Sequence, residues 1–150
     1  MHGKGHSMAE RCFRYSTSGV WLKGNTHIHS TKSDGGKTPQ ELGAMYAQAG
    51  YDFIFHTDHW VASDVEHDSV TAPLIRLDGI ELDGPDRAGS DYHVVCLGTV
   101  NGFETTMGLV GAMERARAQG ALIILAHPHW MGNTIDEALR HGFDGVEVYN

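Results

Sequence analysis

Short strand-like runs, most of them strongly apolar, recur along the chain and are separated by segments with helical periodicity. The runs lie at residues 20–26, 51–55, 74–80, 121–126 and 146–148. The run at 121–126 is apolar without alternation, which is typical of a strand covered on both faces. The pattern therefore predicts several short, buried strands rather than a few long ones.

Clear helix signals stand between the strand-like runs. Residues 38–49 begin with Thr38 as N-cap, Pro39 at the first helical position and Glu41 as the capping-box partner, and Gly50 ends the helix. Two more helices are predicted from similar signals, at residues 105–119 and 134–141. Strands that alternate with helices predict a parallel α/β architecture.

Residues 74–97 leave two topologies open. Strands at 74–82 and 92–97 flank a turn-rich segment at 83–89, so they form either a hairpin or two strands joined by a crossover. Residues 60–73 are polar and predict at most a short helix near Asp64.

Histidine and carboxylate side chains gather at the carboxyl ends of the predicted strands. They are His27, His29, His56, Asp58, His59, Glu81, His127, His129 and Glu147. Parallel strands deliver their carboxyl ends to the same rim of a β/α protein, so we expect these groups to converge. Convergent imidazoles and carboxylates are what a multi-metal hydrolytic site requires.

Taken singly, several of these signals are weak. The pair His27 and His29 places two imidazoles near one cation, although many such pairs are surface features. Asp34 lies in a Ser-Asp-Gly-Gly segment and, in isolation, is better explained as a turn residue. His56 is explained equally by the end of its strand, and His93 by a place in the core.

The carboxylates in apolar surroundings are stronger signals. Of Asp58 and His59, at the end of a buried strand, we expect one to be a metal ligand and the other to orient it. Glu81 follows an apolar strand, where a carboxylate is costly unless it is paired or bound to metal. Its two oxygens can also bridge two cations.

Composition narrows the classes of function. A chain of 150 residues forms one domain, and its net charge of -8 argues against nonspecific binding to nucleic acid or membrane surfaces. Residues 1–10 resemble a leader added for expression, which leaves 11–150 as the domain. Cys12 and Cys96 fit no Cys-x-x-Cys spacing and favour a reducing, cytoplasmic location. No secretory signal or membrane-spanning stretch is evident.

The joint pattern resembles the polymerase and histidinol phosphatase (PHP) family of metal-dependent phosphoesterases. The matching stretches are residues 24–35, 50–59, 78–82, 92–95, 126–128 and 144–150. The resemblance implies a distorted (β/α)7-type barrel that holds up to three divalent ions, with zinc, manganese or iron as the candidates. The family has a further Asp-x-His motif near the end of its domain, so we expect this chain to be truncated at its C-terminal end.

Carried over residue by residue, the resemblance also implies a ligand set. His27 and His29 would bind one ion, which Glu81 would bridge to a second. His93 and His127 would complete the second site, and Asp34 and His59 would belong to a third. Glu81, His59 and His129 are the candidate catalytic residues, and His129, Glu147 and Asn150 are expected behind the ligands or at the substrate rim.

The predicted function is hydrolysis of a phosphate ester by metal-activated water. The expected partner is a phosphorylated small molecule or nucleotide, with nucleic acid only as a substrate and no membrane. Lys23, Lys32, Lys37 and Arg87 are potential phosphate contacts, although solvated surface charge explains each of them better. Two alternatives stay open: an amidohydrolase-like enzyme, and a non-catalytic, truncated metal-binding module.

Overall fold

The structure, a computed structural model, describes residues 18–63 and 73–149. Its strands are β1 (Gly24–Asn25), β2 (Phe53–His56), β3 (Ile75–Pro85), β4 (Asp91–Leu97), β5 (Leu122–Leu125) and β6 (Gly145–Val146). Its helices are α1 (Pro39–Gln48), the 3₁₀ turn η2 (Thr105–Met107), α2 (Gly108–Ala118), α3 (Pro128–Met131) and α4 (Ile135–Arg140). The leader predicted at residues 1–10, Cys12, Asn150 and the segment around Asp64 lie outside the described residues.

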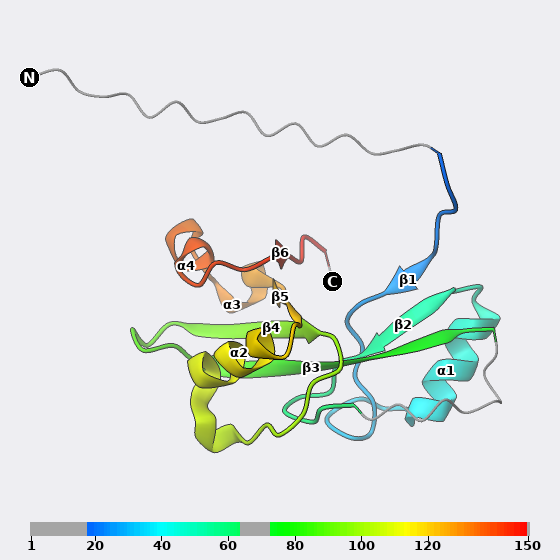
Figure 1. Cartoon of the computed structure of the whole chain (residues 1–150), viewed down its shortest axis with the longest axis horizontal. Helices are drawn as coiled ribbons and strands as arrows, with labels where there is room; N and C mark the ends of the chain where they lie inside the picture. Colours follow the sequence, from blue (N-terminus) through cyan, green and yellow to red (C-terminus); the bar gives the residue numbers. More distant parts are fainter. Residues whose placement is uncertain (1–17, 64–72, 150) are drawn as a thin grey trace, which may run out of the picture.

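The strands form one curled sheet in the order β1-β2-β3-β4-β5-β6 (Figure 1). The neighbours β1–β2, β2–β3 and β5–β6 are parallel, whereas β3–β4 and β4–β5 are antiparallel. The sheet is therefore mixed, with parallel pairs at both ends and antiparallel pairs in the middle, and the hairpin alternative for residues 74–97 is confirmed. The physical reason is the short connection at residues 86–90, which can reverse the chain but cannot cross over to a parallel strand.

The two outer strands are shorter than the sequence predicts. The run at 20–26 contributes only β1, and the segment expected as a strand at 145–149 contributes only β6. Each of these strands pairs on one side only, with β2 and β5 respectively. Beyond the paired residues, the backbone has no neighbouring strand with which to form hydrogen bonds, so the strands end there. Trp21 and Tyr149, which lie outside these short strands, are exposed.

The curled sheet divides the core into two parts. Helix α2 packs against β3 and β5, and the larger apolar cluster fills this space with Ile80, Leu82, Val94, Leu109, Met113 and Ile123 among its members. Helix α1 contacts β2, and a smaller cluster there contains Ile28, Leu42, Ile54 and Leu74. The candidate chemistry lies where the two parts meet, at the ends of β1, β2 and β5.

Local signals for the helices are confirmed. Thr38 and Glu41 form the capping box at α1, and Thr134 and Glu137 form the second one at α4. Cys96 is fully buried in the larger cluster, as a core residue should be. None of the helices in the described part of the chain has the length and apolar character needed to cross a membrane.

Candidate metal centre

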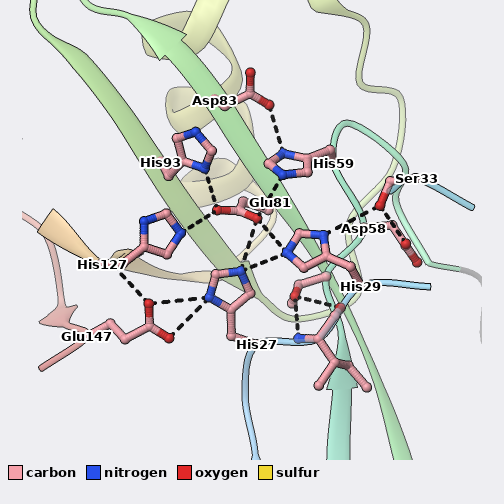
Figure 2. A network of polar contacts seen from close by, with 12 residues as sticks. His27, His29, Ser33, Asp58, His59, Glu81, Asp83, His93, His127 and Glu147 are labelled. Atoms are coloured by element: carbon pink, nitrogen blue, oxygen red, sulfur yellow. Dashed lines mark hydrogen bonds and ion pairs between the residues drawn. The ribbon is translucent and has the colours of Figure 1, made fainter. Parts of the chain in front are cut away.

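Glu81 lies at the centre of a ring of five imidazoles (Figure 2). Its Oε2 atom is 3.0 Å from Nε2 of His27, 2.8 Å from Nε2 of His29 and 3.4 Å from Nε2 of His59. Its Oε1 atom is 2.8 Å from Nδ1 of His93 and 3.3 Å from Nε2 of His127. The carboxylate is fully buried, and each of its oxygens meets a separate group of ring nitrogens.

The sheet brings these groups together from distant parts of the sequence. His27 and His29 follow β1, His127 follows β5, and His59 is joined to Glu81 by an isolated parallel bridge. His93 lies on β4 and pairs with Asp83 of β3. Asp83 is two residues after Glu81, so the two carboxylates are on the same face of β3. The expected convergence of strand ends is thus present although the sheet is not all parallel.

The ligand-type atoms form two groups that share Glu81. His27, Glu81 and His127 each offer an atom within 4.8 Å of the others, and so do His29, His59 and Glu81. Imidazole nitrogens and carboxylate oxygens suit zinc, iron and manganese. The atoms are close enough that a single carboxylate can take part in both groups.

Glu81 is strongly stabilised in its charged form. Burial of its carboxyl opposes ionisation, but hydrogen bonds from His27, His29 and His93 outweigh burial and hold the pKa of Glu81 well below its usual range. The hydrogen bond to Glu81 likewise raises the pKa of His93 above its ordinary value, against the effect of burial. A carboxylate that stays charged at neutral pH is the form that binds cations.

His27 is gripped on both sides of its ring. Its Nε2 atom faces Glu81, and its Nδ1 atom lies 3.1 Å from Oε1 of Glu147, beyond β6. Burial lowers the pKa of His27, but the hydrogen bond to Glu81 and the charges of Glu81 and Glu147 outweigh it and raise that pKa. An imidazole held by a carboxylate on one nitrogen and facing a site with the other is typical of metal-binding histidines.

Glu147 also fixes His127. The backbone N–H of His127 donates to Oε2 of Glu147 at 2.9 Å, and His127 adopts a φ of 24°, in the left-handed region that residues other than glycine rarely enter. Burial lowers the pKa of His127, which favours its neutral form. Its Nδ1 atom is buried without a hydrogen-bond partner among the described residues.

His59 has an outer partner that the sequence did not reveal. Its Nδ1 atom is 2.9 Å from Oδ1 of Asp83, while its Nε2 atom faces Glu81. The signal in the sequence was the spacing of Glu81 and Asp83, two positions apart and therefore on one face of a strand. That segment was expected to be a turn from residue 83, whereas β3 continues to Pro85.

Asp58 does not orient His59, contrary to the expectation that one of the two binds metal and the other orients it. Its buried carboxylate accepts hydrogen bonds from the Ser30 backbone N–H, the Ser30 hydroxyl and the Ser33 hydroxyl, at 2.7, 2.7 and 2.8 Å. Asp58 thus anchors the loop that carries Asp34. One of these donors, the Ser33 hydroxyl, also lies 3.4 Å from Nδ1 of His29, so the anchored loop contacts the ring of histidines.

Asp34 is brought to the edge of the cluster by that loop. Its Oδ1 atom is 3.2 Å from Nδ1 of His29, and its Oδ2 atom is 4.0 Å from Nε2 of His59. A side chain at Gly35 would collide with the backbone carbonyl of His29, so the close turn depends on glycine at this position. A third group of ligands around Asp34 and His59 remains a prediction.

Two histidines predicted near the site lie elsewhere. His129 is exposed on α3 and does not line the pocket over Glu81, so its position does not support a catalytic role. His56 is buried in β2, and neither of its ring nitrogens has a hydrogen-bond partner among the described residues. Of the four candidate phosphate contacts, Lys23 binds the carbonyl of Ala49 and Arg87 lies 3.9 Å from Glu114.

The ring of histidines forms the floor of an open pocket of about 510 Å³. Its walls are apolar and aromatic side chains from α1 and α3: Leu42, Tyr46, Trp130 and Met131. A cavity of this size accommodates a small metabolite.

Comparison with known proteins shows similarity in fold. No protein-family model and no curated protein matches the chain. A two-domain protein from Bacteroides vulgatus, described as containing a predicted PHP-like metal-dependent phosphoesterase, superposes with a TM-score of 0.62 and 22% identity. The match covers 85% of this chain and 44% of that one, so this chain spans less than half of that protein.

A second solved structure is similar over most of its own length. An amidohydrolase from Chromobacterium violaceum, with bound sulfate and no metal, superposes with a TM-score of 0.57 and 17% identity, over 84% of this chain and 76% of that one. Both matches relate this chain to the fold of these proteins.

Proposed function

We propose that this protein is a metal-dependent phosphoesterase whose centre is bridged by Glu81. The observation that carries the proposal is that the two oxygens of this carboxylate face different histidines. Oε2 faces His27, His29 and His59, while Oε1 faces His93 and His127. Similarity in fold to a protein described as PHP-like and metal-dependent supports it.

The donor set fits divalent cations better than it fits protons alone. His27 has a carboxylate at each ring nitrogen, so without a cation it must carry two protons beside four other imidazoles. Its Nε2 atom is also 3.0 Å from Nε2 of His29. Only one of these two nitrogens can donate a hydrogen bond to the other, and the acceptor must then carry no proton. With a cation bound, the Nε2 atoms of His27 and His29 would both offer it lone pairs, and the Nδ1–H of His27 would donate a hydrogen bond to Glu147.

The residues would then have separate tasks. His27 and His29 would hold one ion, His93 and His127 a second, with Glu81 between them, and Asp34 and His59 would hold a third. Bound divalent ions supply positive charge for the phosphate oxygens and an activated water as nucleophile. Glu147 and Asp83 would orient His27 and His59.

His59 is also placed to move a proton. Its side chain is 24% exposed at the pocket, and the contact of Nδ1 with Asp83 leaves Nε2 facing Glu81. When it is not occupied as a ligand, its Nε2 atom can give a proton to the leaving alkoxide. His129 lacks this access, so we assign no such role to it.

An amidohydrolase-like reaction is the second candidate, and the fold of the Chromobacterium protein favours it. That class resembles this site in its His-x-His pair but usually relies on a bridging lysine. Among the described residues that line the pocket there is no lysine, and Glu81 occupies the bridging position. Phosphoester hydrolysis is therefore preferred.

The test is hydrolysis of a panel of phosphomonoesters, nucleotides and N-acyl amino acids by protein loaded with zinc, manganese or iron. Metal-dependent release of phosphate that is lost in His27→Ala supports the proposal. Metal-dependent amide cleavage without phosphate release would favour the amidohydrolase candidate. Stoichiometric metal binding with no turnover of either class would favour a non-catalytic module.

A further inference from the structure

We propose that the substrate is the monophosphate ester of a flat aromatic group, which stacks on Trp130 while its phosphate lies over the histidines. This inference rests on the proposed function and adds the chemical class of the leaving group. It depends on the position of Trp130, on the apolar walls of the pocket and on the absence of lysine and arginine among the described residues that line it.

Trp130 lines the pocket with most of its side chain exposed to solvent. It follows His127 by three residues on α3, and its indole is 64% exposed although it lines the pocket. The indole and the His127 imidazole are 5.1 Å apart between centroids and tilted by 32°. The Trp130 backbone N–H donates to the carbonyl of His127 at 2.9 Å, which holds the main chain of Trp130 next to a candidate ligand.

The pocket separates a polar floor from an apolar upper part. Met131 continues the wall beside Trp130, while Leu42 and Tyr46 of α1 also line the cavity. The Tyr46 hydroxyl accepts a hydrogen bond from the side-chain amide of Asn25 at 2.8 Å, so its polar end is already engaged. A ligand with one compact polar end and one flat apolar end fits these walls.

The charges in the pocket favour a single phosphate group. Among the described residues that line it there is no lysine or arginine, and the cationic capacity is confined to the histidines and the ions they would hold. A second or third phosphate of a nucleoside polyphosphate would find no cationic side chain above this floor. A monoester leaves only its uncharged end at Trp130.

Binding of inert phosphonates to the metal-loaded protein tests this without relying on turnover. Benzylphosphonate and methylphosphonate carry the same anionic head, and calorimetry gives their affinities for the wild type, Trp130→Ala and Trp130→Phe. We expect the wild type to prefer the benzyl compound, Trp130→Ala to lose about tenfold of that preference and Trp130→Phe to keep most of it. Methylphosphonate should bind all three proteins equally.

Trp21→Ala is the matched control, because Trp21 is 71% exposed but does not line the pocket. It should leave both affinities unchanged. The phosphonate analogue of a purine nucleoside monophosphate, tested beside benzylphosphonate, distinguishes a nucleotide from a simple aryl ester as the source of the ring. Circular dichroism confirms that each variant is folded.

The outcomes separate this inference from the proposed function. Equal binding of both phosphonates, or a benzyl preference that survives in Trp130→Ala, overturns the aromatic substrate and leaves phosphoester hydrolysis standing. A preference dependent on Trp130 without turnover of any phosphomonoester retains the aromatic site and overturns hydrolysis. If neither phosphonate binds, the aromatic substrate is overturned, and phosphate release from the phosphomonoester panel decides separately whether hydrolysis stands.

Discussion

The Nδ1 atom of His59 lies 2.9 Å from the Oδ1 atom of Asp83, and this contact turns the other ring nitrogen of His59 toward the buried Glu81. Neither residue is close to the other in sequence, yet β3 continues far enough to bring Asp83 beside the end of β2. Asp83 therefore controls the orientation of a candidate ligand without facing the pocket floor itself.

Removing this carboxylate should weaken metal binding. For Asp83→Ala we expect affinity for zinc or manganese to fall about 10- to 100-fold, because the ring of His59 loses the partner that fixes its orientation and basicity. Chelator competition measures the affinity. Asp91→Ala, at an exposed position beside the turn of the same hairpin, is the control and should bind metal like the wild type. Equal affinities in the two variants would contradict the role of Asp83.

Glu81→Gln tests the bridge directly. An amide has one oxygen acceptor in place of two anionic oxygens, so it cannot serve both histidine groups. We expect elemental analysis to find at least one ion fewer per chain than in the wild type, and phosphate release to fall by about 100-fold or more. Glu114→Gln makes the same change at an exposed position and should alter neither value. Full metal content in Glu81→Gln would exclude Glu81 as the bridge.

The ligand-type residues could be predicted because each of them ends a recognisable strand. His27, His59, Glu81 and His127 were found by their position after apolar runs, and the fold places the three histidines around the Glu81 carboxylate. Capping boxes located the starts of α1 and α4 for the same reason: the signal is local and complete within four residues.

Contacts between distant segments could not be predicted in this way. The grip of Glu147 on His27 spans 120 positions and depends on how the sheet curls. The direction of β4 followed from a short turn whose topology the sequence left open. Asp58 was misassigned because its partners, Ser30 and Ser33, carry no distinctive pattern. His129 matched the histidine pattern, but α3 turns it away from the pocket.

The same substitution should lower stability at Asp58 and metal content at Asp34. Asp58→Asn disturbs three hydrogen bonds to a buried charge, so we expect the free energy of unfolding to fall by about 2 kcal/mol in urea denaturation of the metal-free protein. Asp34 is 70% exposed, and Asp34→Asn should change stability by less than about 0.5 kcal/mol while reducing the number of bound ions. Loss of stability in Asp34→Asn alone would reverse these assignments.

His56 makes the stability of the protein depend on pH. Burial, aided by the positive charge of Arg76 and opposed by Asp58, lowers the pKa of His56 below its ordinary value. The unfolded chain then takes up a proton near pH 6.5 that the folded protein does not bind, so the free energy of unfolding should decrease as the pH falls below that value. Above pH 7 this residue should contribute no pH dependence.

His56→Leu isolates this contribution from the other histidines, since only the difference between variant and wild type is compared. The wild type should lose about 1 kcal/mol more stability than His56→Leu between pH 7 and pH 5.5, because one pKa unit corresponds to about 1.4 kcal/mol. His129→Leu, at an exposed position, should follow the wild type at both pH values. Parallel pH profiles for His56→Leu and the wild type would mean that folding leaves the pKa of His56 unchanged, contrary to this prediction.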